Sequence, residues 1–291
     1  MGPLNHAIHI MCLHPIRRLE DQVVIHDLNL NNYVEIAEGI FWVGYADTDA
    51  SLHCNPYLIT DHDEAVLIDS GSRGDFSTVM LKVLRTGTNP RNITRLIYQH
   101  YDPDLCGNIP HMESMINNPN LRILSHSQNN IFINYYSAVT SKEDIQSTGL
   151  EYIFTSGRKL RFIPTPYSHS PGSFVTYDVK TKTLFSSDLY GSYDIGWNLY
   201  TTITPECCRC VPQKNCPKSN TPCEVIGMYD FHKMIMTSNK ALHYAIQEIM
   251  KLDIVMIAPQ HGSIIHSEEA IQSASQLLLT LDGVGIDGVV V

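Results

Sequence analysis

Metal-capable side chains follow short apolar runs at four separate places in the sequence. At each place glycine, proline or another turn-forming residue comes soon afterwards. Imidazole and carboxylate groups are the ligands that iron, zinc and manganese take in proteins. The four sets are His100, Asp102 and Asp104 after TRLIYQ, His169 after RFIPTPYS, Asp188 after TLFSS, and His261 after DIVMIAPQ. If these runs are strands that end at one edge of a sheet, the side chains form one metal site.

The first set has a spacing of two residues. His100, Asp102 and Asp104 occupy alternate positions beyond the apolar run at 93–98. Alternate residues of an extended segment point to one side of it. We therefore predict that an extended segment brings these three ligands to one or two cations without the help of a helix.

Each of these signals has an ordinary alternative. A single histidine after a strand is more often a cap or a surface residue than a ligand, and an isolated Asp-x-Asp pair is more often part of a turn. This sequence combines two carboxylates after a histidine with two further histidines and an aspartate at strand exits. Turn chemistry does not account for that combination, which favours a metal site.

The pattern of the chain predicts the elements that would position this site. Short β-rich runs at 33–69 indicate a meander, and the apolar spacing at 75–85 indicates a helix with Asp75 as its N-cap. Further strands are expected at 93–98, 121–125, 160–164, 174–178, 183–187 and 253–258, and helices near 105–117, 227–251 and 267–281. This order predicts an α/β sandwich of two sheets with helices on the outer faces.

Size and composition limit the class of protein. The chain has 291 residues, 43% hydrophobic residues and a formal charge of -10, which argues against nucleic acid and anionic membranes as partners. No apolar run reaches the ~18 residues of a membrane span, and the first residues lack the order of a signal peptide. We therefore predict a cytoplasmic protein with an N-terminal extension at 1–32 and a single domain at 33–291.

One part of that domain has no periodic pattern. Residues 189–224 are irregular and hold five of the eight cysteines, and their position suggests a lid over the site. A separate zinc site, reversible disulfides and a flexible loop are all compatible with the spacing. The five cysteines are Cys207, Cys208, Cys210, Cys216 and Cys223.

The segment HYDPDLCG resembles the H-x-[E/H]-x-D-H-x-G motif of the metallo-β-lactamase superfamily. Asp69 in VLIDSG and the segments around His169, Asp188 and His261 fall where the other motifs of that superfamily fall, over roughly residues 33–281. The resemblance implies an αββα sandwich with a binuclear site. The implied ligands are His100, Asp102, His169 and a bridging Asp188 for one metal, and Asp104, Asp188 and His261 for the other.

The likeness is stronger to one branch of the superfamily. Asp102 stands where the zinc hydrolases have histidine, and the resulting oxygen-rich site favours iron or manganese. In this respect the sequence is similar to the di-iron domain of flavodiiron proteins. Leu105 stands where their metal-binding histidine follows the aspartate, so the second metal loses a nitrogen ligand and gains an open position. The sequence contains no flavin-binding loop, and we expect no flavin.

Three segments, HYDPDLCGNIP, TPYSHSPGSFVTYD and LFSSDLYG, closely resemble the oxygen-binding di-iron proteins of bacterial chemotaxis. This resemblance implies two non-haem iron ions with dioxygen as their ligand, in a sensor that signals to a chemoreceptor. Oxygen is the expected signal, and iron is a second candidate signal. The first alternative is a reductase of dioxygen or nitric oxide with an external electron donor. The second is a binuclear hydrolase with a metal-bound hydroxide. Flavodiiron proteins form dimers, which makes a homodimer a reasonable expectation.

Four further residues are candidates for the surroundings of the site. Asp69 matches an aspartate of the family that organises the ligands, and His53 lies where flavodiiron domains place residues that face the pocket. Tyr101 and Tyr190 lie close to predicted ligands, where a hydroxyl could face bound oxygen. The alternatives are a turn residue for Asp69, a structural histidine for His53 and ordinary packing for the tyrosines. The histidines treated as non-ligands are His111, His126, His232, His243 and His266.

Overall fold

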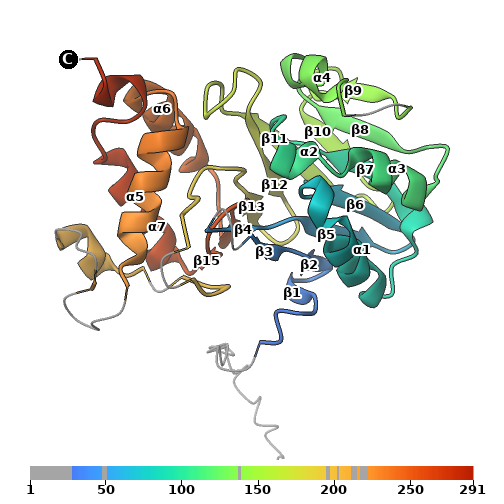
Figure 1. Ribbon diagram of the computed structural model, residues 1–291, viewed down its shortest axis with the longest axis horizontal. Coiled ribbons are helices and arrows are strands. Elements are labelled where there is room, and N and C mark those ends of the chain that lie inside the picture. Colours follow the sequence, from blue (N-terminus) through green and yellow to red (C-terminus); the bar gives the residue numbers. More distant parts are fainter. Residues whose placement is uncertain are drawn as a thin grey trace, which may run out of the picture.

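Two β-sheets pack face to face, and helices cover both outer faces (Figure 1). The structure is a computed structural model that describes residues 28–47, 51–136, 139–194, 197–201, 203–210, 215–216 and 222–290. The arrangement confirms the predicted αββα sandwich. Most of the predicted N-terminal extension, residues 1–27, lies outside the described residues.

The first sheet has seven strands in the order β1-β2-β5-β6-β7-β8-β9. Its strands are β1 (Val34–Ala37), β2 (Ile40–Trp42), β5 (Tyr57–Asp61), β6 (Glu64–Ile68), β7 (Ile93–Ile97), β8 (Arg122–Ser125) and β9 (Lys142–Asp144). The meander β1-β2-β5-β6 is antiparallel, whereas β6, β7, β8 and β9 run parallel to one another. A separate hairpin of β3 (Tyr45–Asp47) and β4 (Leu52–Cys54) lies between β2 and β5 in the chain.

The second sheet has six strands in the order β10-β11-β12-β13-β14-β15. Its strands are β10 (Glu151–Ile153), β11 (Lys159–Pro164), β12 (Phe174–Asp178), β13 (Thr183–Phe185), β14 (Met256–Ala258) and β15 (Ile265–His266). Strands β13 and β14 are parallel, and every other pair in this sheet is antiparallel.

The helices fall into two groups on opposite sides of the sandwich, as Figure 1 shows. On the side of the first sheet are α1 (Phe76–Arg85), α2 (Pro103–Cys106), α3 (Ile109–Ile116) and α4 (Ser127–Ile133). On the side of the second sheet are α5 (Glu224–Ile235), α6 (Asn239–Ile249) and α7 (Glu268–Leu279). Short 3-10 helices span Arg73–Asp75, Pro90–Asn92, Pro205–Arg209 and Ile286–Gly288. None of the described helices is long and apolar enough to cross a membrane.

The core follows from the alternation of side chains along the strands. Leu58 and Leu67 of the first sheet face the layer that packs under α1 and α3. Their neighbours Ile59 and Val66 face the layer between the two sheets, which also contains Phe174 of the second sheet. A third layer lies between the second sheet and α5, α6 and α7. Strands buried on both faces hold the loops at their ends in fixed positions.

Some of the helices and strands predicted from the sequence are longer than those found in the structure. The helix expected near 105–117 is divided into α2 and α3, where Gly107 lies so close to neighbouring backbone that an added Cβ would be 2.5 Å from the carbonyl oxygen of Pro103. The helices expected near 227–251 are found as α5 and α6, and Ser238 starts the second of them as its N-cap. The strand expected at 253–258 is limited to β14. Asp75 takes the N-cap position of α1, but its side chain makes no capping hydrogen bond.

His232 is the fully buried histidine on α5, and its two ring nitrogens are both used in packing the helix. Nδ1 donates to the carbonyl of Met228 at 2.7 Å, and Nε2 accepts from the backbone N–H of Tyr190 at 3.1 Å. Burial disfavours the charged ring and lowers the pKa of His232 from 6.5 to about 4. This supports its assignment as a non-ligand.

That pKa predicts acid sensitivity. Because the unfolded chain takes up this proton near pH 6.5 and the folded chain does so only near pH 4, stability is complete above the first value and falls as the pH drops towards the second. Between about pH 7 and about pH 5 the wild type should lose about 2 kcal/mol more unfolding free energy than His232→Gln. Urea unfolding in chelator measures both proteins, and equal losses would show that His232 is not buried as a neutral ring.

Candidate metal centre

Four chain segments meet at one edge of the sandwich. Strands β13 and β14 are parallel, so the loops that carry Asp188 and His261 leave the sheet side by side, and the N–H of Gln260 donates to the carbonyl of Ser187 at 2.8 Å. Strand β11 runs in the same direction as β13, because each is antiparallel to β12. His169 therefore follows β11 at the same edge. The loop after β7 supplies the remaining three residues from the first sheet.

One half of the site contains His100, Asp102 and His169 around Asp188. Nε2 of His169 lies 3.3 Å from Oδ2 of Asp102 and 3.1 Å from Oδ2 of Asp188. Nε2 of His100 lies 3.9 Å from Oδ2 of Asp102 and 3.8 Å from Oδ1 of Asp188. His100, His169 and Asp188 can each offer a ligand atom within 4.8 Å of the others. Two imidazoles and two carboxylates thus surround one space.

The other half contains His261, Asp104 and, again, Asp188. Nε2 of His261 lies 3.1 Å from Oδ2 of Asp104 and 3.8 Å from Oδ1 of Asp188. The same Oδ1 atom lies 3.8 Å from Nε2 of His100 in the first half. Asp188 therefore occupies the position between two groups of ligands that a bridging carboxylate needs. All six residues predicted as ligands come together.

The backbone conformation of residues 100–104, which carry His100, Asp102 and Asp104, differs from the prediction. Residues 100–104 do not form one extended segment, since Asp102 precedes helix α2 and Asp104 lies in its first turn. Pro103 favours this geometry because its fixed φ suits the first position of a helix. The turn of the helix directs Asp102 towards His169 and Asp104 towards His261. The prediction of three side chains on one side of a strand was wrong, although all three residues lie around the same space.

The site is deeply buried on one side and open on the other. The side chains of His100 and Asp188 are 1% and 4% exposed, whereas those of Asp102 and Asp104 are 36% and 33% exposed. The carboxylates after β7 therefore form the open side. A small molecule would approach the centre between them.

Charge and hydrogen bonding fit a pair of cations. Nε2 of His100, Nε2 of His169 and Oδ1 of Asp188 are buried and make no hydrogen bond of normal geometry, and buried polar atoms ordinarily have partners. Burial alone would lower the pKa of His169, but Asp102 and Asp188 outweigh it and raise this pKa to about 10. Burial acts in the opposite direction on Asp188, yet the neighbouring imidazoles hold its pKa well below its usual range. The aspartates thus stabilise positive charge in this space.

Hydrogen bonds at Nδ1 orient two of the imidazoles. Nδ1 of His100 lies 2.9 Å from Oγ of Ser187, and Nδ1 of His261 lies 3.0 Å from the backbone carbonyl of His53. When Nδ1 donates to such a partner, Nε2 keeps its lone pair for a metal ion. The spacing of Ser187 directly before Asp188 was a signal for this role that sequence reasoning did not use.

The predicted surroundings of the site are found in part. Asp69 is 1% exposed, and the side-chain amide of Gln260 lies 3.1 Å from its Oδ2, with the nitrogen as donor. This position fits the predicted organising role. Leu105 is fully buried in the hydrophobic layer next to α1 and α3, and its side chain has no atom that could bind a metal ion.

Three aromatic side chains have other partners. His53 stacks on Trp197 with 3.4 Å between ring centroids, and its Nδ1 lies 2.5 Å from Oδ2 of Asp194, so its backbone rather than its ring contacts a ligand. Tyr101 stacks on Phe132 of α4. The prediction that Tyr190 faces the pocket is not supported, because its buried hydroxyl lies 2.9 Å from Oγ of Ser275 on α7.

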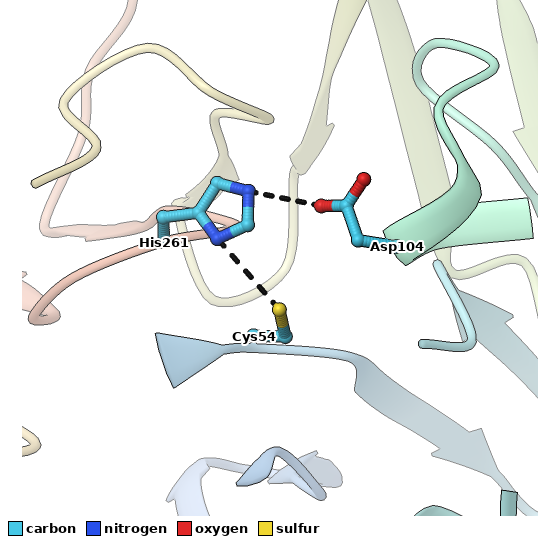
Figure 2. A group of neighbouring side chains, drawn as sticks. All are labelled: Cys54, Asp104 and His261. Carbon is cyan, nitrogen blue, oxygen red and sulfur yellow. Dashed lines mark hydrogen bonds and ion pairs between the residues drawn. The ribbon is translucent and has the colours of Figure 1, made fainter. Parts of the chain in front are cut away.

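Cys54 is a further residue next to the site that sequence reasoning missed. Its Sγ lies 3.8 Å from Nδ1 of His261, and Cys54, Asp104 and His261 can each offer a ligand atom within 4.8 Å of the others (Figure 2). Among the clustered cysteines, the described Cys207, Cys208, Cys210, Cys216 and Cys223 form no disulfide. The 3-10 helix Pro205–Arg209 packs on α7, where Sγ of Cys208 lies 3.5 Å from the carbonyl of Ser273. The lid at 189–224 remains a prediction.

Comparison with known families and sequences gives consistent results. A family model described as "ODP family beta lactamase" matches residues 52–262. The chain is 26% identical over 251 residues to an uncharacterised protein of Methanocaldococcus jannaschii, covering 79% of this chain and 56% of the relative. It is 26% identical over 211 residues to a putative diflavin flavoprotein of Synechocystis, covering 72% of this chain and 33% of the relative. The chain thus spans about half of the first relative and a third of the second.

Solved structures agree with the fold. The structure titled "Peroxy diiron species of chemotaxis sensor ODP" is 25% identical, with a TM-score of 0.67, and the match covers 89% of this chain and 98% of that chain. A flavo di-iron protein variant from Thermotoga maritima is 20% identical, with a TM-score of 0.70, and the match covers 85% of this chain and 61% of that chain. These likenesses confirm the predicted metallo-β-lactamase-like sandwich.

Proposed function

The chain belongs to the ODP family of beta-lactamase-like proteins, and on this premise we propose that it is a non-haem di-iron protein that binds dioxygen and acts as an oxygen sensor. The observation that carries the proposal is the meeting of three histidines and two aspartates around Asp188 at one half-open edge of the sandwich. The similar sensor structure matches this chain over nearly its whole length, which supports sensing over the other activities of the fold.

The proposed iron ligands divide between the two halves of the site. His100, Asp102 and His169 would hold one ion, Asp104 and His261 would hold the other, and Asp188 would bridge them. Carboxylate ligands at both ions favour iron over zinc. The iron pair would supply the electrons and the coordination position that dioxygen requires. Ser187 and the carbonyl of His53 keep two imidazoles aimed at the ions.

The proposal extends to the setting of the protein. We place it in the cytoplasm, signalling to a chemoreceptor or another chemotaxis protein, without a resident flavin and as a homodimer. The chemotaxis sensor among the similar structures supports the partner class. A yellow flavin chromophore released by acid precipitation of the purified protein would contradict the flavin part of the proposal.

Oxygen uptake separates a sensor from an enzyme. The reduced, iron-loaded protein should take up dioxygen in proportion to its iron, and with excess chemical electron donor and flavin mediator it should consume no more than this amount above the iron-free control. Iron-free protein is the control. Continued dioxygen consumption over many turnovers would contradict sensing and support a reductase.

A reductase of dioxygen or nitric oxide is the second candidate because two relatives are named as an oxidase and as a nitric oxide reductase. A coenzyme F420H2 oxidase of Methanocaldococcus jannaschii is 21% identical, covering 79% of this chain and 56% of that protein. A nitric oxide reductase of Moorella thermoacetica is 25% identical, covering 55% of this chain and 42% of that protein. The same experiment with nitric oxide in place of dioxygen tests the second of these activities.

A further inference from the structure

Cys54 is held beside His261 by the backbone of both segments. The two residues form an isolated antiparallel bridge, and the N–H of Asn55 donates to the carbonyl of Gln260 at 2.9 Å. The side-chain amide of Asn55 also donates to the carbonyl of Gly262, at 2.9 Å. Cys54 itself is 2% exposed. The position of its sulfur is therefore fixed by the fold.

The sulfur lies close to the second half of the site, next to Nδ1 of His261, while Asp104 lies next to Nε2 of the same ring. Figure 2 shows Cys54 and Asp104 both on the side of the His261 ring that carries its two nitrogens. One ligand atom from each of these three residues lies within 4.8 Å of the other two. Atoms that bind one ion at roughly 2.0–2.3 Å are separated by about 3 to 4.5 Å. A small adjustment would let all three residues bind the same ion.

The imidazole does not need the sulfur as a hydrogen-bond partner. Nδ1 of His261 already lies 3.0 Å from the carbonyl of His53, whereas the sulfur is 3.8 Å away. A carbonyl at the shorter distance is the better acceptor for the Nδ1 proton. Cys54 is thus a buried thiol next to a half-site with one imidazole, where the other half-site has two.

We propose that Cys54 binds the metal ion of the second half through its thiolate. This inference rests on the proposed binuclear site. On binding, the S–H bond breaks, the sulfur bonds to the ion and the proton goes to solvent. The thiolate would take the place of the nitrogen that is missing at Leu105, which belongs to the same buried layer as Cys54. The two ions would then differ, because only one has a soft sulfur ligand.

Cobalt substitution under anaerobic conditions tests this ligand. Cobalt(II) with a thiolate ligand has an intense near-ultraviolet charge-transfer band, which oxygen and nitrogen ligands do not give. The tested chain carries serine at the five clustered cysteines, Cys207, Cys208, Cys210, Cys216 and Cys223, so that they do not contribute. We expect two cobalt ions per chain and a thiolate band. Cys54→Ser should remove the band and weaken binding of the second ion at least about tenfold.

The matched control is Cys106→Ser, because Cys106 is equally buried but its Sγ lies 3.7 Å from the carbonyl of His100 rather than beside an imidazole. This variant should keep the band and both ions. Two bound cobalt ions without a band in the parent chain, or a band that survives in Cys54→Ser, would overturn the thiolate ligand alone. Failure of the parent chain to bind two ions would overturn the binuclear site as well.

Discussion

Asp188→Ala is expected to leave the protein without either metal ion. Of the three aspartates in the site, Asp188 approaches imidazoles of both halves, with Oδ2 3.1 Å from Nε2 of His169 and Oδ1 3.8 Å from Nε2 of His261. Removing it takes a ligand from each ion and leaves three imidazoles around a space that has lost its central charge. Iron per chain, measured after anaerobic reconstitution and desalting, should fall from two to near zero.

Two further variants show whether this loss reports bridging. Asp104→Ala removes a ligand that approaches only His261, so it should cost one ion and leave the other in place. Asp253→Asn changes an exposed carboxylate that pairs with Lys182 far from the site, and it should retain both ions. If Asp188→Ala also loses only one ion, Asp188 serves a single half and the bridging assignment is wrong.

The second large effect concerns the stability of the fold. Asp178 is fully buried, and it accepts two hydrogen bonds from Arg158, at 3.0 Å to Nε and 2.9 Å to Nη2. Nη1 of Arg158 also donates to the carbonyl of Thr60 at 3.1 Å, so this ion pair of the second sheet holds the first sheet as well. Asp178→Asn leaves a buried guanidinium without its counter-charge, which should lower the unfolding free energy by about 3–5 kcal/mol.

Urea unfolding compares this variant with two others. Arg158→Met combined with Asp178→Leu removes both charges, and it should recover much of the lost stability because no uncompensated charge remains. Asp253→Asn breaks an exposed pair and should change stability little. A small loss in Asp178→Asn would show that water reaches the guanidinium and that the pair is not buried.

The residues that meet at this edge could be picked out from the sequence because each group of them follows an apolar strand within a few residues. The strands at 174–178 and 93–97 are found as expected or nearly so, and strand ends in a sandwich lie at common edges. The path of the chain between ligands could not be predicted in the same way. Pro103 starts helix α2 within the motif. As a result, Asp104 lies next to His261, whereas Asp102 lies next to His169.

Contacts between distant segments explain what sequence reasoning missed. Cys54 and His261 are 207 positions apart, and only the bridge between their backbones makes them neighbours. Tyr190 was expected near the site because it follows Asp188 by two residues. Its positive φ of 63° belongs to a tight turn after β13, and its hydroxyl contacts Ser275 of α7. Closeness in the sequence was therefore a poor guide to the position of Tyr190, because a turn directs its side chain away from the site.

The central claim is that these residues hold two iron ions that bind dioxygen and keep it. The most direct measurement is iron content per chain after anaerobic purification and reconstitution, together with the optical spectrum before and after exposure to air. The account predicts two iron ions per chain and a visible charge-transfer band that appears in air and decays slowly. One zinc ion per chain and no visible band would contradict it.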